Sequence, residues 1–208
     1  MDSEIVVRQA NPSDAVTAAR LIYLTMGPLA DYLVGLGDPA RALRVLGELF
    51  SRPRNRFSYQ FTDLVLVAGD VAGLLTSYPE KGIRRRDLST GRQLMQILSV
   101  GDFLRFVRCS LTLVNLREAA AGEYFVNSVA VLPEFRRQGI ATQLMTLAEA
   151  RARQHGLDRC SLSVEVDNGA ACGLYERLGY RTVDTRCWPR LQRLIGYSGQ
   201  RRMVKPLA

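Results

Sequence analysis

Apolar positions in the first third of the chain change repeatedly between strand spacing and helix spacing. Alternating, β-branched segments predict strands, and a Gly69-Asp70 pair between two of them predicts a tight hairpin. Segments with apolar residues three and four apart, preceded by capping residues or proline, predict helices. The expected elements are a strand over 5–9, helices over 11–26 and 39–50, and strands over 57–67 and 71–77.

The last part of the chain repeats this alternation. A helix between two strands at this spacing predicts parallel neighbours joined by a right-handed crossover. The final strand is expected to pair antiparallel inside the sheet, and 188–199 reads as an extended loop or short helix. The expected elements are strands over 123–131, 160–166, 180–187 and 201–207 and helices over 140–155 and 168–179. The fold class is therefore α/β (α+β), with a mixed central sheet of about six to seven strands flanked by helices.

The stretch 88–121 stands apart, because it is apolar on more than one helical face. It predicts two helical pieces divided near Gly101-Asp102, inserted between the third and fourth strands. Such a surface must be covered. Three interpretations remain open: additional core, a lid over a substrate pocket, or the interface of a homodimer.

Length and composition indicate one ordinary globular domain over residues 1–208. The 47% hydrophobic and 23% charged residues are typical of such domains. Met1–Glu4 lacks the basic and apolar regions of a signal peptide, and no apolar run is long enough to span a bilayer. We therefore expect a cytoplasmic protein with no membrane partner. Its four cysteines are expected to be reduced, and buried or inert: Cys109, Cys160, Cys172 and Cys187.

The net charge is +8, yet the basic residues are scattered rather than gathered on one helix. This distribution argues against a nucleic-acid partner. The basic residues cluster at one place, Lys81 and Arg84-Arg85-Arg86. The first interpretation of this cluster is a solvated loop, and the alternatives are a contact with coenzyme phosphate, an acidic substrate or RNA. Nothing in the spacing of cysteine and histidine predicts a metal site.

The most informative segment is Val129–Thr142, where an apolar strand passes through a basic turn into a helix. Arg136-Arg137-Gln138-Gly139 precedes a helical stripe that begins at Ile140. The first N–H groups of a helix have no partners within it, and its dipole is positive at that end. This turn is therefore a predicted anion site, and we expect it to bind a pyrophosphate.

Arg136-x-x-Gly139-x-Ala141 resembles the signature of the GCN5-related N-acetyltransferase (GNAT) superfamily. The resemblance extends upstream to Val129–Pro133 and downstream through Glu165–Tyr180, so it covers about 123–187 well. Ala141 stands where a second glycine is commoner. The resemblance implies the GNAT fold, acetyl-CoA (coenzyme A) as co-substrate, and an amine acceptor, either a small molecule, an amino acid, or a peptide or protein amine.

The resemblance also implies where the coenzyme binds. A bulge in the fourth strand would open a gap to the fifth, in which main-chain groups of Val129 and Val131 bond the pantetheine arm. Asn168 would contact the coenzyme, although Asn is also a favoured helix cap. The coenzyme-binding candidates are Val129, Ala130, Val131, Arg136, Arg137, Gln138, Gly139, Ile140, Ala141, Thr142, Asn168 and Tyr175.

Two catalytic residues are predicted. Tyr175 lies seven residues after Asn168 on the same helical face, and its phenol can protonate a departing thiolate; the alternative is a packed core tyrosine. Glu123 begins the fourth strand and is the candidate general base, although the family's glutamate aligns with Phe125. Glu165, Asp167 or a water chain are the alternatives, and a non-catalytic acyl-CoA-binding module is the rival function.

Overall fold

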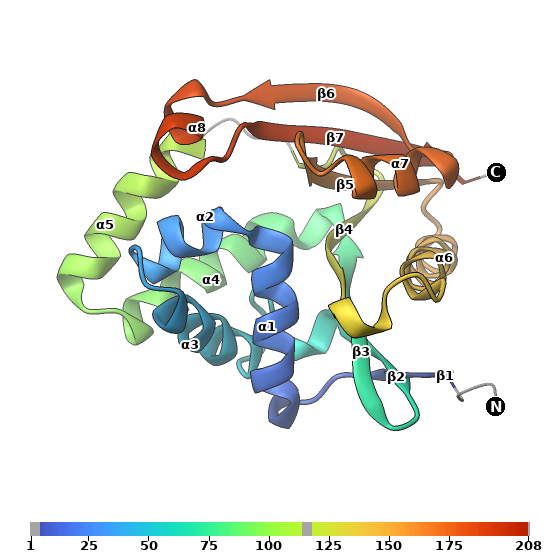
Figure 1. Cartoon of the computed structure of the whole chain (residues 1–208), viewed down its shortest axis with the longest axis horizontal. Helices are drawn as coiled ribbons and strands as arrows, with labels where there is room; N and C mark the ends of the chain where they lie inside the picture. Colours follow the sequence, from blue (N-terminus) through green and yellow to red (C-terminus); the bar gives the residue numbers. More distant parts are fainter. Residues whose placement is uncertain (1–4, 114–117, 208) are drawn as a thin grey trace.

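One seven-stranded mixed sheet organises the computed structural model, which describes residues 5–113 and 118–207 (Figure 1). Its strand order is β1-β2-β3-β4-β5-β7-β6, so the last strand in sequence lies between β5 and β6, as predicted. All neighbours are antiparallel except β4 and β5. The strands are β1 (Ile5–Gln9), β2 (Thr62–Val67), β3 (Asp70–Pro79), β4 (Glu123–Val131), β5 (Arg159–Glu165), β6 (Arg181–Cys187) and β7 (Gly199–Pro206).

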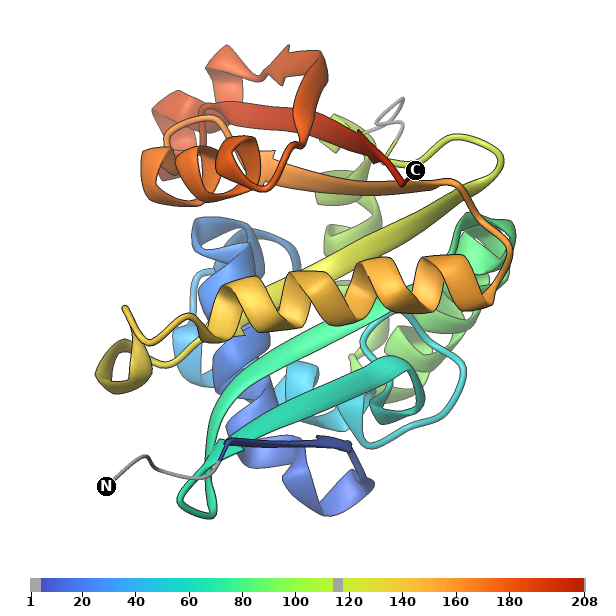
Figure 2. The same ribbon diagram turned by 90° about the vertical axis from the view of Figure 1, so that its right-hand side faces the viewer.

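Helices cover both faces of this sheet. Figure 2 shows α6 crossing the strands on one face, where its buried residues join a core cluster that also takes in α7. The second cluster lies on the opposite face and holds α1, α3 and part of α4. The helices are α1 (Ala15–Met26), α2 (Pro28–Ala30), α3 (Pro39–Phe50), α4 (Ile83–Ile97), α5 (Val100–Ser110), α6 (Ile140–Gln154), α7 (Gly169–Arg177) and α8 (Pro189–Ile195).

The β4 strand changes partners part-way along its length. It pairs with β5 only from Glu123 to Val126, and no pair joins the two strands beyond that point in the described chain. The register between β3 and β4 also shifts at Thr76/Ser77, which leaves Asn127 as the extra residue of a β-bulge. The bulge and the separation of β4 from β5 agree with what the family resemblance implies.

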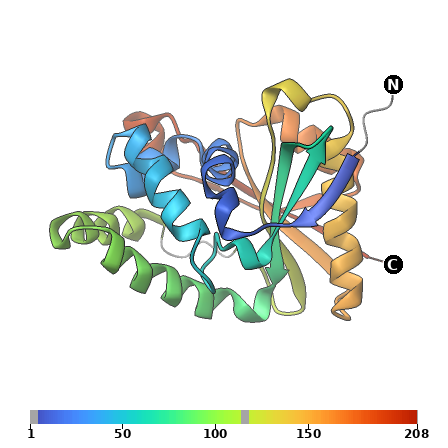
Figure 3. The ribbon, with the colours of Figure 1, turned by 90° about the horizontal axis from the view of Figure 1, so that it is seen from below.

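The insertion between β3 and β4 consists of α4 and α5, which extend from the body of the molecule in Figure 3. Leu94 and Leu98 are buried in the second core cluster. The outward face leaves Leu88, Met95 and Leu104 more than 60% exposed. Part of the insertion is thus core, as one of the three interpretations predicted. That the exposed face forms a homodimer interface stays a prediction, which light scattering in solution would test.

Several predicted boundaries were wrong. The insertion becomes helical at Ile83 rather than Leu88, so the arginine cluster is the first turn of α4 and not a loop. The helices divide at Ser99, whose side chain caps α5, close to the predicted Gly101-Asp102. Helix α5 ends at Ser110, short of the predicted 121, and residues 114–117 of that prediction lie outside the described residues.

Two further predictions concern side chains and membrane spans. The four cysteines are free thiols; Cys109, Cys160 and Cys172 are buried, and Cys187 is exposed. Among the described residues, no helix is long and apolar enough to cross a membrane.

Candidate functional site

A cavity of about 1400 Å³ runs through the gap between β4 and β5. The turn before α6 and the start of α7 line one end, and α1, α4 and α5 line the other. All of the predicted coenzyme-binding residues line this cavity except Gln138. The residues predicted from the sequence to bind the coenzyme therefore lie together around one cavity, and their binding role stays a prediction.

The turn before α6 has the backbone of an anion site. Arg137 and Gly139 both have positive φ, +67° and +79°, and Gly139 is the residue before Ile140, where α6 begins. A Cβ added at Gly139 would meet no described atom within 4 Å, so the space beside it is open. Arg136 and Arg137 are exposed there. Free helix N–H groups, open space and two guanidinium groups together suit a phosphate ligand.

The far half of β4 offers main-chain hydrogen-bonding groups to the gap. Leu132 donates its N–H to Ala72 of β3, and groups alternate in direction along an antiparallel strand. Val129 and Val131 therefore direct their main-chain groups toward β5, where Arg136 Nε reaches the Val131 carbonyl at 3.5 Å. The same alternation directs the main chain of Ala130 toward β3, so Ala130 contributes its side chain to the cavity rather than its peptide group.

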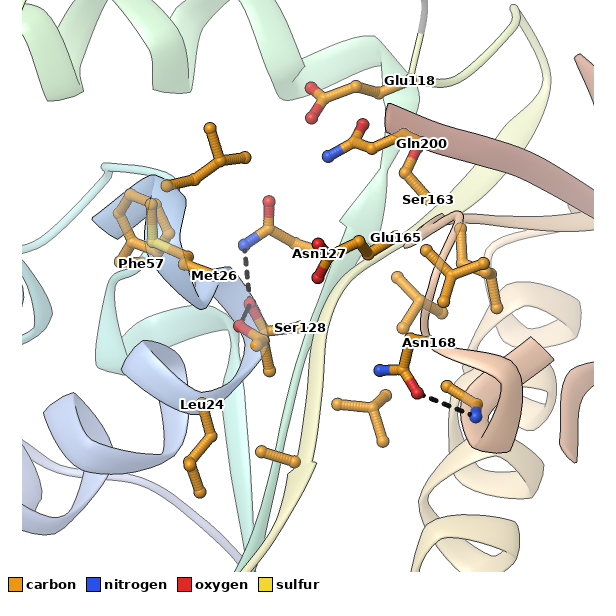
Figure 4. A pocket seen from close by; sticks show the side chains of 18 of the residues that line it. Leu24, Met26, Phe57, Glu118, Asn127, Ser128, Ser163, Glu165, Asn168 and Gln200 are labelled. Atoms are coloured by element: carbon orange, nitrogen blue, oxygen red, sulfur yellow. Dashed lines mark hydrogen bonds between the residues drawn. The ribbon is translucent and has the colours of Figure 1, made fainter. Parts of the chain in front are cut away.

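Asn168 and Tyr175 stand at the two ends of the α7 face that borders the gap. The Asn168 side chain accepts from the Ala171 N–H at 3.1 Å and caps α7, which leaves its exposed amide NH₂ available (Figure 4). Tyr175 is 9% exposed, packs edge-on to Tyr180, and makes no side-chain hydrogen bond within the described residues. Burial, with a smaller contribution from Cys172, raises the pKa of Tyr175 to about 12. Its hydroxyl is thus a protonated, uncommitted donor.

Glu123 lies outside the cavity. Its carboxylate accepts from Arg202 Nη2 at 2.5 Å through Oε1 and from the Ala120 N–H at 2.8 Å. Only 3% of Glu123 is exposed. A carboxylate held in a buried ion pair is poorly suited to accept a proton from a substrate, so the predicted role of Glu123 as base receives no support.

Glu165, one of the predicted alternatives to Glu123, lines the cavity, whereas Glu123 does not. Glu165 ends β5, and Figure 4 labels it among the residues that line the cavity. Burial first, and the charge of Asp167 second, raise the pKa of Glu165 above its ordinary value. A raised pKa makes a carboxylate a better proton acceptor near neutral pH.

The sequence analysis did not predict a hydrogen-bonded network that surrounds the bulge. Asn127 Oδ1 accepts from Tyr78 Oη at 3.0 Å and from Arg56 Nη2 at 3.1 Å. Arg56 in turn pairs with Glu118 at 2.5 Å and with Asp87 of α4 at 3.4 Å. The available signal was the polar pair Asn127-Ser128 in the middle of a mostly apolar strand. The network ties the insertion to the bulge.

Comparison with known proteins identifies the family. The sequence model of the acetyltransferase (GNAT) family matches residues 69–180, which is more than half of the chain. The chain belongs to this family. Its fold agrees, because an N-acetyltransferase structure from Staphylococcus aureus Mu50 superposes with a TM-score of 0.72 over 96% of this chain and 99% of the other, at 20% identity.

Curated relatives match this GNAT chain over shorter stretches. GCN5-related N-acetyltransferase 4, chloroplastic, of Arabidopsis thaliana is 36% identical over 77 residues, which is 36% of this chain and 26% of that protein. An acetyltransferase of Pectobacterium atrosepticum is 41% identical over 56 residues, 27% of this chain and 40% of the other. The matched part thus spans less than half the length of either relative.

Proposed function

We propose that this GNAT chain transfers an acetyl group from acetyl-CoA to a primary amine in a ternary complex. The observation that carries the proposal is the cavity between β4 and β5, which joins the turn before α6 to the buried hydroxyl of Tyr175 and to Glu165, whose carboxylate has no ion-pair partner among the described residues. The relatives' names support acetyl transfer.

The residues present suit coenzyme A. Its pyrophosphate would lie on the turn Arg136–Thr142, where Gly139 leaves open space. Main-chain groups of Val129 and Val131 would bond the pantetheine amides, and one N–H there would stabilise negative charge on the carbonyl oxygen. The free NH₂ of Asn168 would add a donor.

The chain's own side chains would then move the protons. As the amine nitrogen forms the new N–C bond, the C–S bond breaks and the sulfur takes the proton of the Tyr175 hydroxyl. Glu165, directly or through water, takes the proton that the amine loses. An acyl-cysteine route has no support, because burial raises the pKa of Cys172 and keeps its thiol protonated.

Calorimetric titration with acetyl-CoA and a thiol-release assay with a panel of primary amines test the proposal. Acetyl-CoA should bind, free coenzyme A should appear only with an amine, and Gly139→Glu should abolish binding by filling the open space with an anion. Retained affinity in Gly139→Glu would contradict the phosphate site. Tight binding without thiol release on any amine would favour the rival function, a non-catalytic acyl-CoA-binding module.

A further inference from the structure

The end of the cavity beyond Asn127, away from the coenzyme turn, has two chemically different walls, and this inference rests on the proposed function. We call this end the acceptor pocket. Figure 4 shows Met26 and Phe57 on one side and Glu118, Glu165 and Gln200 on the other. We propose that the acceptor is a primary amine carried by a bulky apolar group and lacking a carboxylate beside the amine.

The first wall is apolar and comes from several elements. Met26 ends α1, Leu29 lies in α2, Phe57 precedes β2, and the insertion adds Phe106 of α5 and Leu113 just after it. Apolar area removed from water contributes about 25 cal/mol per Å². A ring or branched chain on the acceptor would bury much of this wall, whereas a small polar amine would leave the wall exposed to water.

The second wall carries an excess of hydrogen-bond acceptors and of negative charge. Glu118, Asp87 and Glu165 place three carboxylates around the pocket, and among the described residues that line this end Arg56 is the one cationic side chain. Arg56 is already committed to Glu118, Asp87 and Asn127. An ammonium group is attracted here, and an added carboxylate would face two unneutralised negative charges.

An unused hydrogen-bond acceptor supports a ligand at this wall. Within residues 5–113 and 118–207, Gln200 Oε1 is buried without a partner, and the Gln200 side chain interacts with the Tyr197 hydroxyl; both residues line the cavity. Tyr197 is 2% exposed. Buried acceptors are normally paired, so Gln200 Oε1 suits a ligand that supplies an N–H donor.

Charge is thus divided along the cavity. The coenzyme end holds Arg136 and Arg137, and the acceptor pocket holds the carboxylates. Each end attracts one of the two substrates and repels the other. The division explains how a chain with net charge +8 can still recognise a cationic acceptor.

The test compares kcat/KM for thiol release with 2-phenylethylamine, ethylamine, phenylalanine and a short peptide that begins with phenylalanine. 2-Phenylethylamine should exceed ethylamine and phenylalanine by about tenfold or more. If the peptide is turned over faster than 2-phenylethylamine, the natural source is a polypeptide N-terminus; if slower, it is a free amine. Equal values for all acceptors, or a preference for ethylamine or phenylalanine, would overturn the inference.

Two variants test the contributions of the two walls independently. Phe106→Ala should lower kcat/KM for 2-phenylethylamine about tenfold and leave that for ethylamine unchanged. Glu118→Gln removes a negative charge and frees Arg56, so the ratio of phenylalanine to 2-phenylethylamine turnover should rise. Glu48→Gln, a surface glutamate outside the cavity, is the matched control and should leave the ratio unchanged.

The outcome also distinguishes this inference from the proposed function. If acetyl-CoA binds but no amine releases thiol, the proposed function fails and the acceptor inference fails with it. If thiol is released with the wrong ranking of acceptors, or if Glu118→Gln leaves the ratio unchanged, the acceptor inference alone fails.

Discussion

At the scale of single residues, Tyr175 is the proposed acid, and its surroundings allow a clean test. Tyr175→Phe keeps the ring packed against Tyr180 and removes only an oxygen that makes no hydrogen bond within the described residues. General acid catalysis contributes about 10²–10⁴-fold, so kcat should fall in that range while the Kd of acetyl-CoA changes little. Tyr180→Phe is the matched control, because Tyr180 lies outside the cavity. Equal turnover in Tyr175→Phe would remove this residue from the mechanism.

Glu165 is the proposed base, and its test is a pH profile. Because burial and Asp167 raise the pKa of Glu165, kcat/KM should be lost as pH falls through that raised value. Glu165→Gln should lower kcat/KM and remove this acid limb, since no carboxylate then titrates there. Asp167→Asn should move the limb to lower pH, because the neighbouring negative charge is gone. An unchanged profile in Glu165→Gln would assign the base elsewhere.

At the scale of secondary structure elements, the sequence predicted what local pattern and capping determine. Proline and apolar spacing placed the helix Pro39–Phe50 at the observed residues. Two features depend instead on pairing between distant segments. The ion pair of Glu123 could not be predicted, because its partner, Arg202, is 79 residues away. The contact of Arg56 with Asn127 likewise spans 71 residues. Local periodicity carries no information about such partners.

The β6–β7 pair that completes the sheet depends on one glycine. Gly199 opens β7 opposite Cys187, and its carbonyl accepts from Val166 next to β5. A Cβ at Gly199 would lie 2.1 Å from the carbonyl oxygen of Arg186, which is backbone and cannot rotate away. Gly199→Ala should therefore lower the free energy of unfolding by about 1–3 kcal/mol, measured by urea denaturation.

The control for that measurement is another glycine. Gly91 lies inside α4, where an added Cβ meets no atom within 4 Å in the described chain. Gly91→Ala should raise the free energy of unfolding by about 0.5–1 kcal/mol, because alanine loses less backbone entropy in a helix. Equal effects of the two substitutions would show that the contact at Gly199 does not matter.

At the scale of the whole molecule, the positive net charge should govern how the coenzyme binds. Residues Arg136 and Arg137 are exposed at the turn, and the rest of the chain adds a positive field. The Debye length falls from about 10 Å at 0.1 M salt to about 3 Å at 1 M. The Kd of acetyl-CoA, measured by calorimetry, should therefore rise several-fold across that range.

A pair of arginine variants separates the local charge from the general field. Arg137→Gln removes a charge from the phosphate-binding turn, so it should weaken binding at low salt and flatten the salt dependence. Arg193→Gln removes an exposed charge on α8, outside the cavity, and leaves the turn intact. If both variants change the salt dependence equally, net charge alone attracts the coenzyme. A larger effect of Arg137→Gln locates the attraction at the turn, because the two substitutions change the net charge by the same amount.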